Sequence, residues 1–215
     1  MAVQHAASQS KTLLAQLNKS PQFWNTHGAA CQTAAYITLG RIFDTKSKFN
    51  VHTLLSKLES SLGEFSIRAL AGRKQGGEQN KPSWLTAYLS TAYVPSKADV
   101  QRLRKAVARY EEIYLRAVQP ARHKHFAHRE KHERVTVAAL FDKGKVGELW
   151  RLVAFLRVLY QALWQLYHNG RKPSLRLPRY SVRAMYASPA HGGSPSENIV
   201  ADTKMLMDLL LRVNA

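Results

Sequence analysis

Residues 122–129 bring together side chains that could act on a phosphate group. Arg122 stands six positions before His128 in this short segment. Arginine can hold a phosphate with two parallel hydrogen bonds, and histidine can both accept and donate a proton near neutral pH. These two capacities predict cleavage of a phosphodiester bond without a metal ion. The further candidates in the segment, for supporting or substrate-binding roles, are His123, His125 and Arg129.

Simpler roles are open for the same residues. Arg122 could bind a phosphate or a helix C-terminus without taking part in catalysis, and His128 could be a core histidine because it continues an apolar stripe. His128 and His132 also have the i, i+4 spacing of a zinc site, but no cysteine or carboxylate cluster nearby completes one. We therefore expect no metal and no other cofactor. Asp44, at the end of its predicted helix, could orient a basic side chain or act as a surface cap.

The charge of the chain indicates the kind of partner. Its 215 residues include 32 Lys and Arg but 14 Asp and Glu, which gives a formal net charge of +18 and a pI of about 10.3. Such an excess favours a polyanion, because bound phosphates release counterions and opposite charges steer the encounter. Together with the 122–129 segment, it predicts RNA as the partner. Hydrophobic residues make up 45% of the chain, which excludes a disordered basic tail.

Three features of the sequence bear on its location. The single cysteine, Cys31, cannot form an intramolecular disulfide and fits a reducing compartment. The first residues lack the charged segment and apolar run of a signal peptide. The most apolar stretch, residues 149–167, is interrupted by arginines and glutamines and indicates a buried helix rather than a membrane span. We expect a cytoplasmic protein that does not contact a membrane.

Apolar residues recur at helical spacing through most of the chain, and no strand-like alternation extends beyond a few residues. The pattern predicts an all-α bundle of four main helices, with extra short helices and a basic C-terminal extension. The last main helix is apolar nearly all round, so most of its surface should be buried. The expected helices cover residues 23–43, 51–62, 96–119 and 146–168, with a short apolar helix at 84–93. A flexible connection is expected over 72–83.

Local signals mark the ends of these helices. Asn50 can cap the second main helix, and Ser96 with Asp99 resembles a capping box. Gly170 follows the last main helix as a stop signal. Pro120 lacks a backbone donor and should kink or restart the third helix, which places residues 122–129 in the first turns of the restart. The second helix is expected to bury one stripe, formed by Val51, Leu54, Leu55, Leu58 and Leu62.

The chain is expected to have two parts. Residues 1–170 should form the bundle, and residues 171–215 a basic loop and a C-terminal helix that packs on the bundle or on a partner chain. Residues 171–196 contain no acidic residue. Tyrosines alternate there with arginines and could stack on RNA bases. The candidate RNA-contacting arginines of this segment are Arg176, Arg179 and Arg183.

Three segments together resemble the HEPN superfamily, and within it the abortive-infection AbiU-like branch. A Phe-Trp pair opens a helix at residues 23–24, and Tyr-Ile-Thr-Leu-Gly-Arg-Ile-Phe-Asp closes it at residues 36–44. A leucine-rich helix follows. Later in the chain, Arg122 precedes Phe-Ala-His-Arg at residues 126–129. The resemblance covers residues 20–168.

The resemblance implies a metal-independent endoribonuclease of a defence or toxin–antitoxin system, active as a homodimer. Arg122 and His128 of both protomers would build one composite site and leave 2′,3′-cyclic phosphate and 5′-hydroxyl ends. A dimer also eases the geometry, because a continuous helix separates these two residues by about 9 Å along its axis and about 120° around it. A cognate antitoxin or nucleotidyltransferase is a candidate further partner.

Two other classes of function are compatible with the sequence. The first is a non-catalytic module of the same fold that binds RNA or a nucleotide, or a dimeric protein-interaction scaffold. The second is one half of a toxin–antitoxin pair whose basic tail contacts an acidic protein. RNA cleavage that depends on Arg122 and His128 would distinguish the ribonuclease from both.

Overall fold

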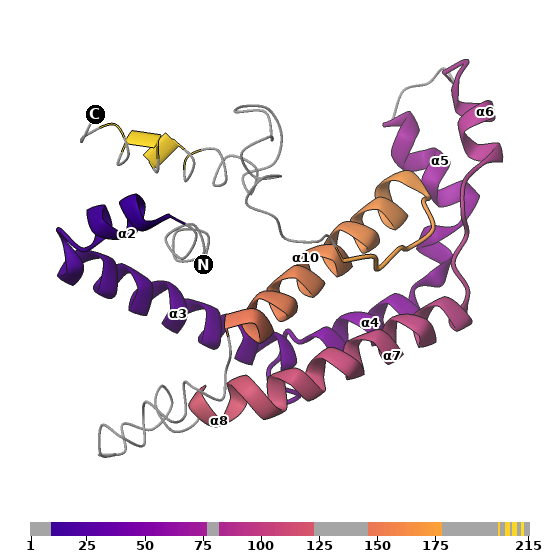
Figure 1. Ribbon diagram of the computed structural model, residues 1–215. Helices are drawn as coiled ribbons and strands as arrows, with labels where there is room; N and C mark the ends of the chain where they lie inside the picture. Colours follow the sequence, from indigo (N-terminus) through magenta and orange to yellow (C-terminus); the bar gives the residue numbers. More distant parts are fainter. Residues whose placement is uncertain are drawn as a thin grey trace. The chain divides into compact units, whose positions relative to one another are not determined.

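The computed structural model describes residues 10–76, 82–122 and 146–177, and six separate residues between positions 202 and 212. All regular secondary structure in these described residues is helical (Figure 1), so the predicted all-α class is confirmed. The elements are α2 (Lys11–Leu17), α3 (Pro21–Phe43), α4 (Val51–Ser60), the 3-10 helix η1 (Leu62–Phe65), α5 (Ile67–Gln75), α6 (Leu85–Ser90), α7 (Lys97–Ile113), the π-helix η2 (Tyr114–Val118), α8 (Gln119–Ala121) and α10 (Val146–Asn169).

The contacts of the chain divide it into two compact units, residues 35–177 and residues 1–34 with 178–215. In the latter unit, Ser10 caps α2 by accepting a hydrogen bond from the Leu13 N–H at 3.2 Å. Leu13 and Leu17 bury one face of this short helix. The site described below belongs to the unit formed by residues 35–177.

The core of the 35–177 unit is built by α4, α7 and α10 together with the end of α3. Leu55 of α4, Val107 of α7 and Leu152 of α10 are almost completely buried. Tyr110 of α7 stacks on Phe155 of α10, with ring centroids 3.9 Å apart and planes inclined by 6°. Each buried leucine side chain contributes about 1.5–3 kcal/mol, so this packing fixes the helices that carry the site.

The predicted helix ends are observed. Asn50 Oδ1 accepts a hydrogen bond from the Thr53 N–H at 2.8 Å, and both bonds of the Ser96–Asp99 capping box are present. Gly170 ends α10 with φ of 57°. A Cβ atom there would lie 2.6 Å from Leu70 Cδ2, so both the backbone conformation and the available space require glycine.

Three predictions about surfaces and boundaries are wrong. Leu54 is 51% exposed, because it is rotated about 100° from its buried neighbour Leu55. The connection expected over 72–83 begins later, since Ser66 caps α5 and this helix continues to Gln75. The described part of α10 also exposes large apolar and aromatic side chains, although most of its surface was expected to be buried; these side chains are Val153, Tyr160, Trp164 and Tyr167. Residues 77–81 lie outside the described residues.

Candidate functional site

Arg122 is carried by a helix that continues through Pro120. Helix α7 passes into the π-helix η2 and then into α8, a new element with Pro120 in its first turn, so the helix restarts at Pro120 as predicted and does so without a break in the chain of helical turns. A proline ring clashes with the carbonyl four residues earlier in an α-helix, and its nitrogen cannot donate to that carbonyl. The wider π-turn directly before Pro120 relieves this conflict, because its hydrogen bonds span five residues instead of four. The extra residue in the π-turn also changes the direction in which the Arg122 side chain projects from the helix.

The side chain of Arg122 lies directly against Gly40 of α3. A Cβ atom at position 40 would overlap Nε and Cδ of Arg122 and would stand 2.6 Å from its Cζ. Gly40 is buried and has no positive φ. Glycine is therefore required here for close approach of the guanidinium, not for an unusual backbone conformation.

Two side chains hold the Arg122 guanidinium from different elements. Its Nη1 atom donates to Asp44 Oδ2 at 3.3 Å and to the Tyr114 hydroxyl oxygen at 3.3 Å. The Arg122 side chain is 22% exposed and that of Asp44 is 30% exposed. The ion pair thus lies at the edge of the bundle, where a phosphate in solution could reach it.

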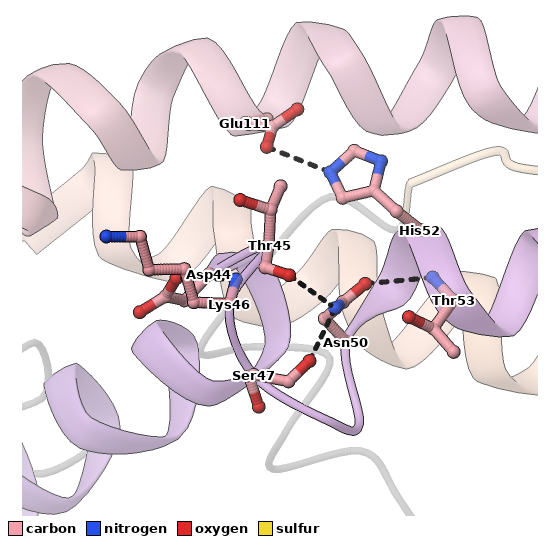
Figure 2. Close-up of polar contacts among 8 residues, drawn as sticks. All are labelled: Asp44, Thr45, Lys46, Ser47, Asn50, His52, Thr53 and Glu111. Carbon is pink, nitrogen blue, oxygen red and sulfur yellow. Dashed lines mark hydrogen bonds and ion pairs between the residues drawn. The ribbon is translucent and has the colours of Figure 1, made fainter.

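Asp44 is fixed by the short loop that joins α3 to α4 (Figure 2). Its Oδ1 accepts a hydrogen bond from the Lys46 N–H at 3.0 Å. The Asn50 amide donates to the carbonyl oxygens of Ser47 at 2.6 Å and Thr45 at 3.3 Å, which closes the loop on the N-terminus of α4. The Lys46 N–H and then the Arg122 guanidinium lower the pKa of Asp44 below its usual value, against the opposing effect of burial. Asp44 is therefore ionised near neutral pH.

Tyr114 supports Arg122 from within its own helix. Its side chain is almost completely buried and its ring stacks on Phe43, with centroids 5.2 Å apart and planes inclined by 18°. Burial chiefly raises the pKa of Tyr114 above its ordinary value, so the hydroxyl stays protonated at neutral pH. The guanidinium is consequently held by one carboxylate and one neutral phenol.

A second polar pair lies nearby along α7 and α4. His52 Nε2 is 2.9 Å from Glu111 Oε1, and both side chains are partly buried (Figure 2). The pair joins the start of α4 to α7, two elements that already pack through Leu55 and Val107. This pair could not be predicted from the sequence, because 59 positions separate its members and neither belongs to a recognisable motif.

The described residues contain three of the predicted site residues. Arg122 and Asp44 are brought together, although 78 positions separate them. Arg176 is exposed in the segment that follows α10. The other candidates, which lie outside the described residues, are His123, His125, His128, Arg129, Arg179 and Arg183.

Metal-ligand clusters and membrane spans can be assessed for the described residues. No group of three His, Cys, Asp or Glu side chains in these ranges is arranged to hold a metal ion. In the same ranges, no helix is both long enough and apolar enough to cross a bilayer.

The helical bundle, with Arg122 directly after α8 and six positions before His128 in the sequence, has the features of a HEPN-class protein. The chain belongs to the abortive-infection-related AbiU2 family of this class, because the HEPN AbiU2 family model matches residues 1–184. This match extends beyond the 20–168 range of the resemblance seen in the sequence and includes the beginning of the basic tail. The comparisons with curated proteins and with solved structures gave no match.

Proposed function

We propose that the chain is a metal-independent endoribonuclease of a defence or toxin–antitoxin type system, with an active site completed by two copies of the chain. The observation that carries the proposal is the guanidinium of Arg122, which is held over Gly40 by Asp44 and Tyr114 at the start of the Arg-to-His segment. Membership of the AbiU2 family supports the same proposal.

Arg122 would bind the phosphate at the scissile bond. A guanidinium held in advance by neighbouring hydrogen bonds needs little reorganisation when negative charge develops on the phosphate oxygens, and this favours the transition state over the ground state. The two described side-chain bonds of Arg122 both use Nη1. Asp44 would act as a positioning residue, since its carboxylate touches the arginine and would repel a phosphate.

Histidine would move the protons. A neutral His128 would take the proton from a ribose 2′-OH, and the 2′ oxygen would attack the adjacent phosphorus. The bond from phosphorus to the 5′ oxygen would break as the protonated imidazole of the partner subunit's His128 gives its proton to that oxygen. The products would be a 2′,3′-cyclic phosphate and a 5′-hydroxyl, and no metal ion or other co-reactant is needed.

Cleavage of RNA by the full-length chain, with EDTA present, tests this proposal. The Arg122→Ala and His128→Ala variants are each expected to lower the rate by about 100-fold or more, because a transition-state donor and a general acid–base group each contribute at least that much. Arg109→Ala is the matched control, since Arg109 is an exposed arginine of α7 with no described partner and its loss changes the net charge equally. Equal rates for the Arg122, His128 and Arg109 variants would contradict the proposal.

The ion pair itself favours one alternative, a non-catalytic HEPN module that binds RNA or a nucleotide or forms a dimeric scaffold. Asp44 already neutralises the charge of Arg122. The same ion pair would be found if the role of this arginine were only to join α3 to α8. This alternative predicts that RNA is bound but stays intact in the wild-type protein, and that Arg122→Ala lowers thermal stability more than RNA affinity.

A further inference from the structure

The exposed face of α10 carries a row of aromatic side chains, which we call the α10 stripe: Tyr160, Trp164, Tyr167 and His168. Tyr160 is 63% exposed and Trp164 is 41% exposed. Tyr160, Trp164 and Tyr167 are four and three residues apart, so their side chains share one side of the helix, and His168 directly follows Tyr167. Trp164 lies on His168 with ring centroids 4.6 Å apart, and His168 meets Tyr167 edge to face at 4.9 Å. Large rings seldom gather on a soluble surface without a partner.

The surroundings of the α10 stripe are basic. The described segments 67–76, 82–95 and 160–177 contain six Lys and Arg but no Asp or Glu. They come together at one end of the unit, where α5, α6 and the end of α10 lie side by side (Figure 1). The described acids that flank residues 67–95 in the sequence are the exposed Glu64 and the buried Asp99, whose carboxylate is occupied by Tyr93, Ser96 and Arg102.

Two of these cations have structural roles. Arg73 donates to the carbonyl oxygens of Glu64 at 2.7 Å and Tyr167 at 2.9 Å, and its guanidinium covers the Tyr167 ring at 4.1 Å. Lys74 donates to Asn169 Oδ1 at 2.7 Å. Both stabilise the C-terminus of α10, where the helix dipole favours positive charge. They hold the rings in place but are themselves already engaged.

Arg171 and Lys172 are the cations best placed for a ligand. Arg171 directly follows Gly170, and its N–H bonds the carbonyl oxygen of Gln165 at 3.2 Å, which fixes the backbone beside the α10 stripe. Lys172 is exposed and lies 5.5 Å from the centroid of the Tyr93 ring. In the described residues neither has a carboxylate partner.

Charge decides what kind of partner the α10 stripe fits. A second copy joined by a two-fold axis would place this basic surface against itself, and like charges would oppose the contact. A polyanion would be attracted by the same cations. The exposed rings add a requirement for flat, stackable groups, which the bases of an unpaired strand supply.

We infer that the α10 stripe, with Arg171 and Lys172, is a second RNA-binding surface, remote in sequence from Arg122, that holds a single-stranded segment of the substrate. Trp164 and Tyr160 stack on bases, and the two cations bind the phosphates between them. This inference rests on the proposed function, since it assumes that RNA is the ligand.

Binding of a fluorescein-labelled 2′-O-methyl oligouridylate to the full-length protein tests the inference. The 2′-O-methyl group blocks the attacking oxygen, so binding is measured without cleavage. Arg171→Gln with Lys172→Gln is expected to weaken binding at least tenfold and to reduce the slope of log affinity against log salt by about 1.4, the value for two lost contacts to a single strand. Trp164→Leu is expected to weaken binding by roughly 5- to 100-fold.

Matched controls separate these effects from charge and hydrophobicity in general. Lys105→Gln with Arg109→Gln removes the same charge from exposed positions of α7, and Phe23→Leu removes an exposed ring of α3. The control variants should bind within about twofold of wild type, because surface charges away from a site contribute little. Circular dichroism and thermal melts confirm that every variant folds.

Four results would overturn the inference. If wild type binds RNA and the stripe variants bind as their controls do, the surface is not used and the proposed function stands. If wild type binds no RNA, both proposals fail together. If polyglutamate at matched charge displaces the labelled RNA as well as unlabelled RNA does, any acidic chain can bind this surface. A change of mass on light scattering caused by Trp164→Leu would assign the surface to a second copy.

Discussion

Gly40 determines how closely Arg122 approaches α3. The guanidinium occupies the space that any other side chain at position 40 would fill, and this brings its Nη1 within reach of Asp44. The atoms that a Cβ would meet belong to the flexible end of an arginine, which can move away. A substitution at position 40 should therefore disturb the site more than the fold.

Gly40→Ala is predicted to abolish most RNA cleavage with little change in stability. The new methyl group would displace Arg122 from Asp44, while alanine favours a helix interior by about 1 kcal/mol over glycine and offsets the lost contacts. Cleavage rate and thermal unfolding of the same preparation check this. Gly72→Ala is the control, because nothing lies within 4 Å of its added Cβ. A Gly40→Ala protein that cuts RNA at the wild-type rate would separate Arg122 from catalysis.

Some of the site could be predicted from residue types alone. The Arg122 segment stood out because arginine can hold a phosphate and histidine can move a proton near neutral pH, and Asp44 was one of two acids considered at helix ends. Their contact could not be predicted, since 78 positions separate them and the rotation of Arg122 depends on the π-turn before Pro120. No local pattern distinguishes a π-turn from a kink. The role of Gly40 likewise becomes visible when the partner side chain is located.

At the scale of elements, the start of α7 depends on Asp99. Its buried carboxylate accepts hydrogen bonds from the Tyr93 hydroxyl at 2.8 Å, from the Ser96 N–H at 2.8 Å and from the Ser96 hydroxyl at 2.8 Å, and it also pairs with Arg102. Burial alone would raise the pKa of Asp99, but these donors lower it to about 2. The ionised form is therefore the one that the folded protein stabilises.

Asp99→Asn is predicted to lower the free energy of unfolding by about 2 kcal/mol at neutral pH. Because the folded pKa lies below the unfolded one, this contribution is complete above about pH 4 and is lost as the pH falls toward 2. Urea unfolding of wild type and variant across this range measures the difference. Glu112→Gln, an exposed carboxylate of the same helix, should show little change. A gap between wild type and Asp99→Asn that persists at pH 2 would show that charge is not its cause.

The features that could be predicted from the sequence are the helix ends, which depend on local hydrogen bonds and backbone conformation. The caps at Asn50 and Ser96 and the stop at Gly170 depend on neighbours within a few residues, and all three are observed. The exposed face of α10 was missed for the opposite reason. An apolar face looks the same in a sequence whether it meets its own core or another molecule, and tyrosine and tryptophan are used in both places.

In the molecule as a whole, the positive charge, the Arg122 site and the α10 stripe would act on the same RNA strand. A net charge of +18 would attract a polyanion such as RNA with little sequence preference. The Arg122 site would perform the chemistry, and the α10 stripe would hold an unpaired part of the same strand.

The RNA ends produced in the presence of EDTA decide whether Arg122 and His128 act as proposed. Wild type should leave 2′,3′-cyclic phosphate and 5′-hydroxyl ends, and a single 2′-deoxy substitution at the cleaved nucleotide should stop the cut there, because the attacking oxygen is gone. Mass spectrometry of the fragments shows both. Ends with a 5′-phosphate, cleavage at the 2′-deoxy position, or activity that vanishes with EDTA and returns with zinc would contradict the mechanism assigned to Arg122 and His128.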